Sequence, residues 1–185
     1  MQIQTKKFAG LTGNQLKLLA LFAMTCDHVG LQLLPQFIFL RIIGRLAAPL
    51  FAYMIAEGCR YTHDRRRYLG RLLGMAALCQ IAYFAAMRSL YQCIFVTFSL
   101  SVCLIYALDS AVRRRTPSSV LLAAAALAAA VFITVELPRI LIHTDFDVDY
   151  GLWGVMLPVL VYFGRGKWGK LALFAVGVGL LGLHY

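Results

Sequence analysis

Long apolar runs alternate with short basic clusters along this chain, and this alternation limits the possible fold more than any other feature. Seven apolar runs can be drawn, at approximately 14–34, 37–59, 68–88, 90–109, 118–137, 148–164 and 168–184. A helix needs about 20 mostly apolar residues to cross a bilayer. The chain is also 61% hydrophobic, whereas soluble domains are roughly 45–50% apolar. We therefore predict an all-α polytopic membrane bundle of about seven transmembrane helices, with residues 1–185 forming one integral membrane domain.

The lysines and arginines are divided unequally between alternate loops. The N-terminus and the second, fourth and sixth loops hold fourteen of the 18 basic residues, while the opposite loops hold only Arg88 and Arg139. Basic loops remain in the cytoplasm, so we expect a cytoplasmic N-terminus and a C-terminus outside. The net charge of +10 is therefore explained by membrane topology and by contacts of the basic loops with anionic lipids. We expect membrane lipids as partners and no nucleic acid.

The first apolar run contains an adjacent carboxylate and imidazole, Asp27 and His28. A carboxylate near the bilayer centre costs at least ~2.5 kcal/mol on insertion scales, so it is rarely kept without a use or a partner. At 1.5 Å per residue, Asp27 lies about 10 Å below the turn after the first helix, and Arg45 of the second helix about 12 Å below it. Asp27, His28 and Arg45 are therefore predicted to share one depth, with Arg41 one turn nearer the outside.

Two interpretations of this group remain open. In the structural one, an Asp–Arg pair holds the hairpin together and His28 is a bystander. In the functional one, Asp27 sets the protonation of His28, and Arg41 and Arg45 bind an anion or a developing negative charge. Two arginines exceed the need of one carboxylate, which favours the functional interpretation.

Polar residues also follow one side of the first helix, where Lys17 and His28 belong to the same stripe. Such a stripe faces a cavity or the bundle interior. It is consistent with interhelical hydrogen bonds and equally with a water-lined tunnel from the cytoplasm to His28.

Charged residues gather where the second helix ends. Glu57 and Arg60 have the spacing of a helical ion pair, or Glu57 serves at a ligand entrance. More arginines follow, among them Arg66 and Arg71. They are typical of a topology determinant that binds lipid headgroups, and they could also bind the phosphates of a nucleotide.

The segment 145–151 resembles the beginning of a calcium loop, but Met156 stands where an EF-hand needs glutamate. We expect no metal there, and Asp149 is predicted to cap the sixth helix. The five cysteines lie in or beside apolar runs without a framework spacing, so no disulfide is expected.

Several segments together resemble one known family. They are Leu16–Gly30, which contains Met24-Thr-Cys-Asp-His28, then Arg41-Ile-Ile-Gly-Arg45 with Ala56-Glu57-Gly58, then Tyr68-Leu-Gly-Arg71, and Asp149-Tyr150-Gly-Leu-Trp-Gly154. In this order they are similar to the TraX family, polytopic proteins named for acetylation of conjugative pilin. The resemblance implies a multi-pass protein of the bacterial inner membrane and an acyltransferase that uses acyl-CoA, most simply acetyl-CoA, as co-substrate.

The resemblance also implies roles for individual residues. His28 would be the catalytic base and Asp27 its partner. Arg41, Arg45 and Glu57 would lie in the working cavity. Substrate or CoA contacts are expected at Lys17, Glu57, Arg60, Arg66, Arg71, Asp149 and Tyr150. The acceptor would be an amine or hydroxyl on a peptide N-terminus, a lipid-linked group or a glycan.

Two other classes of function remain as alternatives. One is a proton-coupled transporter in which Asp27, His28 and Glu57 relay protons. The other is a non-catalytic assembly factor whose buried ion pairs are structural.

Overall fold

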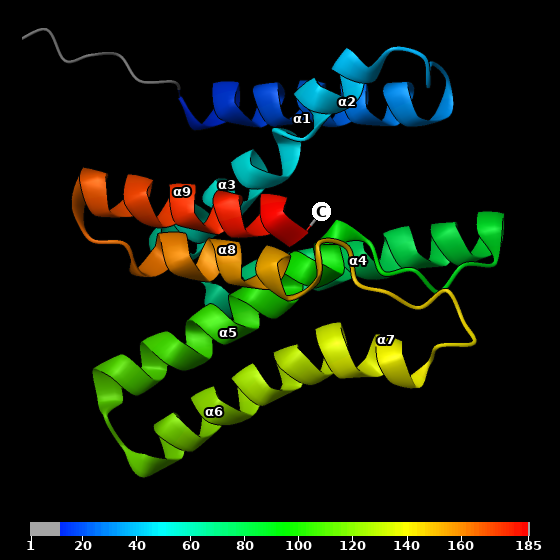
Figure 1. Ribbon diagram of the computed structural model, residues 1–185. Coiled ribbons are helices and arrows are strands. Elements are labelled where there is room, and N and C mark those ends of the chain that lie inside the picture. Colours follow the sequence, from blue (N-terminus) through cyan, green and yellow to red (C-terminus); the bar gives the residue numbers. More distant parts are fainter. Residues whose placement is uncertain (1–11, 185) are drawn as a thin grey trace, which may run out of the picture. The chain divides into compact units, whose positions relative to one another are not determined.

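The computed structural model describes residues 12–184, whose regular structure is helical apart from one isolated β-bridge between Gln92 and Val148. The chain divides into two compact units, which we describe separately. The first ends at Met54 and the second begins at Ile55 (Figure 1). The predicted all-α fold is confirmed, whereas the single domain stays a prediction. Lys6 and Lys7, which contribute to the basic N-terminus, lie outside the described residues.

In the first unit, α1 (Gly13–Gln32) and α2 (Ile38–Gly44) form a closely packed antiparallel hairpin. Two glycines allow the close approach. A Cβ atom on Gly30 would lie 2.9 Å from Leu40 Cβ, and one on Gly44 would lie 2.6 Å from Asp27 Cα. Gly30 thus lies against the beginning of α2, and Asp27 lies against the end of α2. This register agrees with the predicted equal depth of Asp27 and Arg45.

The second predicted helix is interrupted between α2 and α3 (Ala47–Tyr61). Pro49 explains the interruption, because it has no N–H to donate to the Arg45 carbonyl and its ring crowds that carbonyl. The turn is closed by a bond from the Leu46 N–H to the Ile43 carbonyl at 3.1 Å. Arg45 therefore lies at a break that the predicted continuous helix over 37–59 did not contain.

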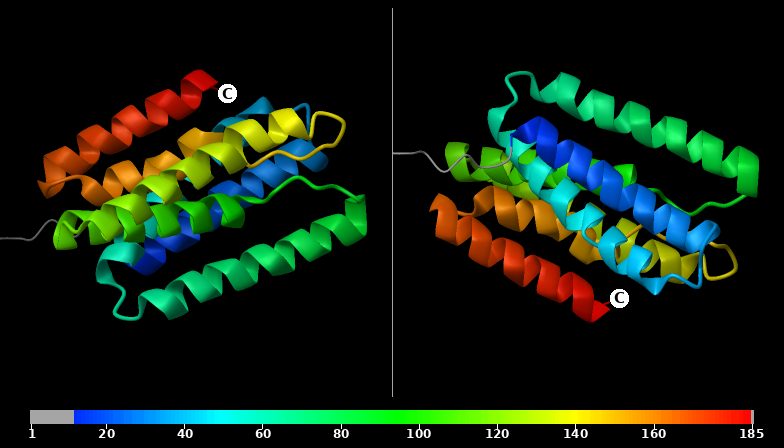
Figure 2. Two further views of the ribbon diagram at one scale, coloured as in Figure 1. Left: turned by 90° about the horizontal axis from the view of Figure 1, so that it is seen from below. Right: turned by 90° about the horizontal axis from the view of Figure 1, so that it is seen from above.

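The second unit is arranged around α5 (Ile94–Arg114), which packs against α4 (Arg65–Met87), α6 (Pro117–Val131) and α8 (Gly151–Phe163). α9 (Gly166–His184) packs against α8. Figure 2 shows α6 and α8 beside α5 from two further directions. α5 is half buried along its most apolar stretch, so it supplies much of the core of this unit.

α6 continues through a short π-helix, η1 (Phe132–Glu136), into α7 (Leu137–Ile140). Pro138 lacks the N–H that would continue a regular α-helical ladder, and the wider turn of η1 directly precedes it. The Thr134 hydroxyl donates to the Ala130 carbonyl at 2.7 Å. This irregular stretch lies at the end of the helix that faces the acidic loop.

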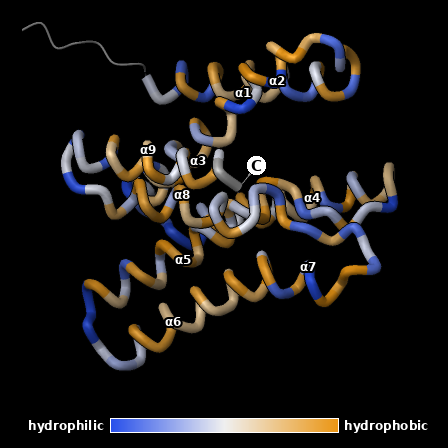
Figure 3. Tube along the Cα trace, in the orientation of Figure 1, coloured by the Kyte–Doolittle hydropathy of each residue, from blue (hydrophilic) through white to orange (hydrophobic). Residues whose placement is uncertain are grey.

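The described residues contain seven helical segments when α2–α3 and α6–η1–α7 are each counted once. Four are long and apolar enough to cross a membrane, namely Ile38–Tyr61, Arg65–Met87, Ile94–Arg114 and Pro117–Ile140. Gly151–Phe163 is a shorter apolar helix. Figure 3 shows the apolar character of the helices and the polar turn between α5 and α6. The predicted helices are therefore present, and length and composition support a membrane-spanning role for four of them.

The loops of the second unit lie at two ends, one rich in basic residues and the other rich in acidic residues. At the basic end, α3, α4, α5, α8 and α9 meet through Arg60, Arg65, Asp109, Arg113 and Lys170. At the acidic end, the Leu90 N–H donates to Asp145 Oδ1 at 3.0 Å and the Gln92 N–H to the Asp147 carbonyl at 2.7 Å. Alternate loops thus lie at opposite ends of this unit, as the charge pattern predicts.

Candidate functional site

The carboxylate of Asp27 lies in the α1–α2 hairpin opposite Gly44 and beside Arg41. Arg41 Nε is 3.9 Å from Asp27 Oδ1, with side-chain exposures of 33% and 26%. This is an ion pair but is too long for a hydrogen bond. Asp27 Oδ1 is buried without a hydrogen-bond partner among the described residues. The carboxylate is therefore charge-compensated but retains an unused acceptor oxygen.

His28 is held by the backbone of its own helix. Its Nδ1 lies 2.9 Å from the Met24 carbonyl oxygen. A carbonyl only accepts hydrogen bonds, so a neutral His28 carries its proton on Nδ1 and presents the Nε2 lone pair. The side chain is exposed within this structure. Asp27 is the predicted partner of His28, but in the structure the Met24 carbonyl orients His28 and Asp27 pairs with Arg41.

Arg45 does not join the predicted buried cluster. It shares the depth of Asp27, but it is exposed and forms no ion pair among the described residues. Gly44 is the residue that faces Asp27, and the next residue of a helix points about 100° away at 3.6 residues per turn. Arg45 therefore lies at the predicted depth, but Arg41 is the arginine that pairs with Asp27. Lys17, in the second turn of α1, is also exposed.

Glu57 joins α3 to α9. Lys170 Nζ lies 2.6 Å from Glu57 Oε1, and Arg60 Nε lies 3.8 Å from the same oxygen. Arg60 also donates to the backbone carbonyls of Tyr162 and Gly164 at the end of α8. The predicted Glu57–Arg60 pair is thus confirmed, and both residues have structural partners. Lys170 was not predicted as a partner, because it lies 113 positions from Glu57.

Asp109 is a buried acid that sequence reasoning missed. It accepts from Arg65 at 2.7 Å and from Arg113 at 2.9 Å, and its side chain is 8% exposed. The Arg65 guanidinium also lies 5.0 Å from the centre of the Tyr106 ring. The four-residue spacing of Asp109 and Arg113 was the available signal. Arg65 is therefore part of the packing and is not available for a ligand.

Arg66 and Arg71 have a different environment on α4. Both are exposed, and neither forms an ion pair among the described residues. Arg67, in contrast, pairs with Asp64 at 3.5 Å. Of the basic residues predicted to bind a nucleotide, Arg66 and Arg71 are consequently the ones that the packing leaves available.

Asp149 and Tyr150 connect the acidic loop to α8. Asp149 Oδ1 accepts from the Tyr91 hydroxyl at 3.0 Å, and its carbonyl accepts from the Thr97 hydroxyl at 2.6 Å. Tyr150 is the N-cap of α8, with a positive φ of 61° and no side-chain capping bond. The prediction that Asp149 caps this helix is therefore wrong, because its carboxylate is bound by Tyr91. A substrate contact at either residue stays a prediction.

Comparison with known proteins identifies the family. The family model described as TraX protein matches residues 12–181. The chain belongs to the TraX family. With its four candidate spans it is a membrane protein of that family, as the resemblance predicted.

Two relatives of the TraX chain are similar over different extents. A probable fimbrial assembly protein, FimC of serogroup H1 from Dichelobacter nodosus, is 27% identical over 90% of this chain and 69% of the relative. The uncharacterized protein RP591 of Rickettsia prowazekii (strain Madrid E) is 55% identical over 38 residues, or 20% of this chain and 15% of the relative. No solved structure matches the chain significantly.

Proposed function

We propose that this protein is a membrane-embedded acyltransferase that moves an acyl group, most simply acetyl, from acyl-CoA to an amine or hydroxyl acceptor. One observation carries the proposal: the Met24 carbonyl fixes His28 so that Nε2 is free to accept a proton. Imidazole is the side chain that proteins most often use as a general base. Membership of the TraX family supports the same reaction class.

In the proposed reaction His28 Nε2 takes the proton of the acceptor as its nitrogen or oxygen attacks the thioester carbon. The new C–N or C–O bond forms, the C–S bond breaks, and the proton passes to the leaving CoA sulfur. Such a general-base step is typically worth 10²–10⁴-fold in rate. Arg45, which is exposed and unpaired among the described residues, would stabilise the oxyanion.

The Asp27–Arg41 pair would act as a support for this site. Asp27 compensates the charge of Arg41 at 3.9 Å and fixes the end of α2 against α1 through Gly44. Asp27 Oδ1 is buried, so it would hold this support in place and would not contact the bound acceptor.

Arg66 and Arg71 would bind the phosphates of CoA. Arginine matches phosphate geometry with paired N–H donors, and these two side chains are not used by the described packing. We propose that the basic end of the second unit faces the cytoplasm of a bacterial inner membrane, since basic loops remain on that side. A relative named as a probable fimbrial assembly protein supports a pilus-related acceptor, such as a peptide N-terminus.

A proton-coupled transporter is the second candidate, in which Asp27, His28 and Glu57 would relay protons. The interruption of the second helix at Arg45 favours it, because transporter sites are often built at broken helices. The Lys170 and Arg60 contacts of Glu57 argue against a relay through that carboxylate.

Binding of acetyl-CoA to the purified protein in nanodiscs separates these functions. We expect saturable binding that weakens about tenfold or more in the double variant Arg66→Glu and Arg71→Glu, while Arg114→Glu at the same end serves as the matched control. Absence of acetyl-CoA binding to the folded wild-type protein would overturn the acyltransferase proposal. Equal binding by the double variant would remove these arginines from it.

A further inference from the structure

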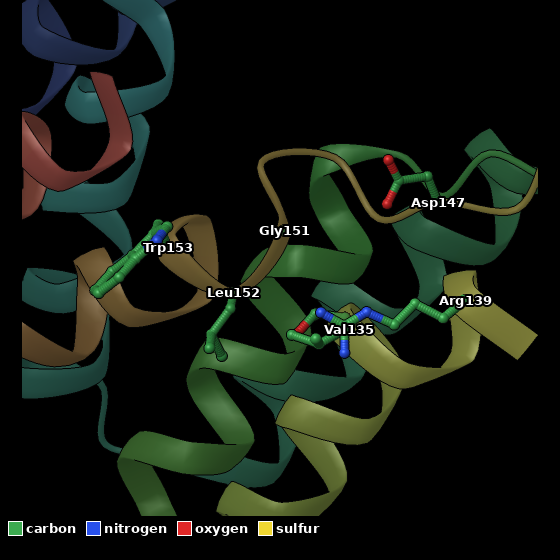
Figure 4. A pocket seen from close by; sticks show the side chains of 7 residues that line it. Val135, Arg139, Asp147, Gly151, Leu152 and Trp153 are labelled. Atoms are coloured by element: carbon green, nitrogen blue, oxygen red, sulfur yellow. The ribbon is translucent and has the colours of Figure 1, made fainter. Parts of the chain in front are cut away.

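A cavity opens at the acidic end of the second unit, outside the groups discussed above. It has a volume of about 300 Å³ and is lined by Thr134, Val135, Arg139, Asp147, Gly151, Leu152 and Trp153. Figure 4 shows the Asp147 carboxylate on the loop above the Arg139 side chain, which extends from α7 toward Val135. The volume is at the lower limit of ligand sites, which range over ≈ 300–1,000 Å³.

The cavity is lined by one basic and one acidic side chain, Arg139 and Asp147, and each is bonded to a different neighbour. Arg139 Nη1 donates to Glu136 at 3.2 Å, with side-chain exposures of 71% and 48%. Such an exposed ion pair is weak, so a better anion can displace Glu136 from Arg139. Asp147 Oδ1 accepts from the Val148 N–H at 2.7 Å, which orients the carboxylate. The cavity can therefore receive an anion at Arg139 and a cation at Asp147.

The position of the cavity indicates where its ligand comes from. Thr134, Val135 and Arg139 belong to the last turns of the candidate span Pro117–Ile140. The end of a span lies at the level of lipid headgroups. Val135 and Leu152 add apolar surface beside the two charges (Figure 4), which suits the glycerol and acyl portion of a lipid.

We propose that this cavity binds the phosphoethanolamine headgroup of a membrane phospholipid, with the phosphate on Arg139 and the primary ammonium on Asp147. The ammonium has three N–H donors for a carboxylate, whereas the quaternary choline group has none. Asp147 thus selects lipids with a primary ammonium, whereas Arg139 binds the phosphate that all phospholipids share. This inference is independent of the proposed acyl transfer.

The test is competition for the protein in detergent micelles, measured by native mass spectrometry with dioleoyl phosphatidylethanolamine and dioleoyl phosphatidylcholine. We expect the ethanolamine lipid to be preferred about tenfold, which corresponds to one charge-assisted hydrogen bond. Asp147→Asn should remove the preference, and Arg139→Gln should weaken both lipids. Arg88→Asn removes a charge elsewhere and should change neither.

The proposal is overturned if the wild-type protein shows no preference, if Asp147→Asn keeps the preference, or if Arg139→Gln binds both lipids as well as the wild-type protein does. Water-soluble glycerophosphoethanolamine distinguishes the source of the headgroup. If it competes as strongly as the whole lipid, the ligand is a free compound and the lipid proposal is wrong. If it competes much more weakly, the lipid is supported.

Discussion

Arg41 Nε lies 3.9 Å from Asp27 Oδ1, and that oxygen has no hydrogen-bond partner among the described residues. The pair is therefore held by charge alone, between Asp27 within α1 and Arg41 within α2. This makes Arg41, and not the neighbouring Arg45, the counter-ion of the carboxylate.

Removal of Arg41 should accordingly destabilise the protein more than removal of Arg45. Arg41→Ala leaves a partly buried carboxylate uncompensated, and we expect a loss of about 1–2 kcal/mol in the free energy of unfolding. Arg45→Ala should cost less than about 0.5 kcal/mol, as for an exposed residue without a partner. Unfolding in mixed micelles measures both, and equal losses would contradict the assignment of the pair.

Gly44 should tolerate no side chain. A Cβ atom there would lie 2.6 Å from both Asp27 Cα and Asp27 Oδ1, so Gly44→Ala must separate α1 from α2. We expect a loss of about 1–3 kcal/mol, the usual cost of overpacking. Gly13→Ala is the control, because nothing lies within 4 Å of its added Cβ. Equal stability of the two variants would mean that the helices are not in close contact at Asp27.

The hairpin also shows how far sequence reasoning extends. Helix rise alone predicted that Asp27 and Arg45 share one depth, because depth follows from counting residues. The direction in which the Arg45 side chain points depends on which residue of α2 faces Asp27 and on the break in the helix before Pro49. Neither can be obtained by counting residues from the turn. Contacts such as Glu57 with Lys170 join distant parts of the sequence, so no local pattern indicates them.

Asp109 should contribute more to stability than the exposed acids. Asp109→Asn leaves Arg65 and Arg113 without their shared anion at a side chain that is 8% exposed. We expect a loss of about 2–4 kcal/mol in the free energy of unfolding. This is somewhat less than the usual cost of about 3–5 kcal/mol for breaking a buried ion pair, because both arginines reach solvent. Glu136→Gln, which breaks an exposed pair with Arg139, should cost less than about 1 kcal/mol. The two variants are compared by unfolding in the same micelles, and a similar cost would show that Asp109 is not effectively buried.

The contact between the loops at the acidic end should weaken in acid. Hydrogen bonds from the Ser89 hydroxyl and the Leu90 N–H lower the pKa of Asp145 below its ordinary value. A lowered pKa contributes stability above the unfolded-state pKa of about 3.9, and this contribution is lost as the pH falls through the lowered value. Amide exchange at Leu90 should therefore show less protection as the pH falls below about 4, after correction for intrinsic rates. Asp145→Asn should remove this dependence, and a persistent dependence would assign it to another group.

The most direct test of the proposed function is acyl transfer by His28 variants. Labelled acetyl-CoA is supplied to the protein in nanodiscs together with a membrane extract that contains the acceptor. The account predicts that His28→Gln folds but loses about 10²-fold or more in rate, because an amide cannot accept the proton, whereas His63→Gln in the exposed loop before α4 keeps the wild-type rate. Transfer by His28→Gln at the wild-type rate would contradict the account and leave His28 as a structural residue.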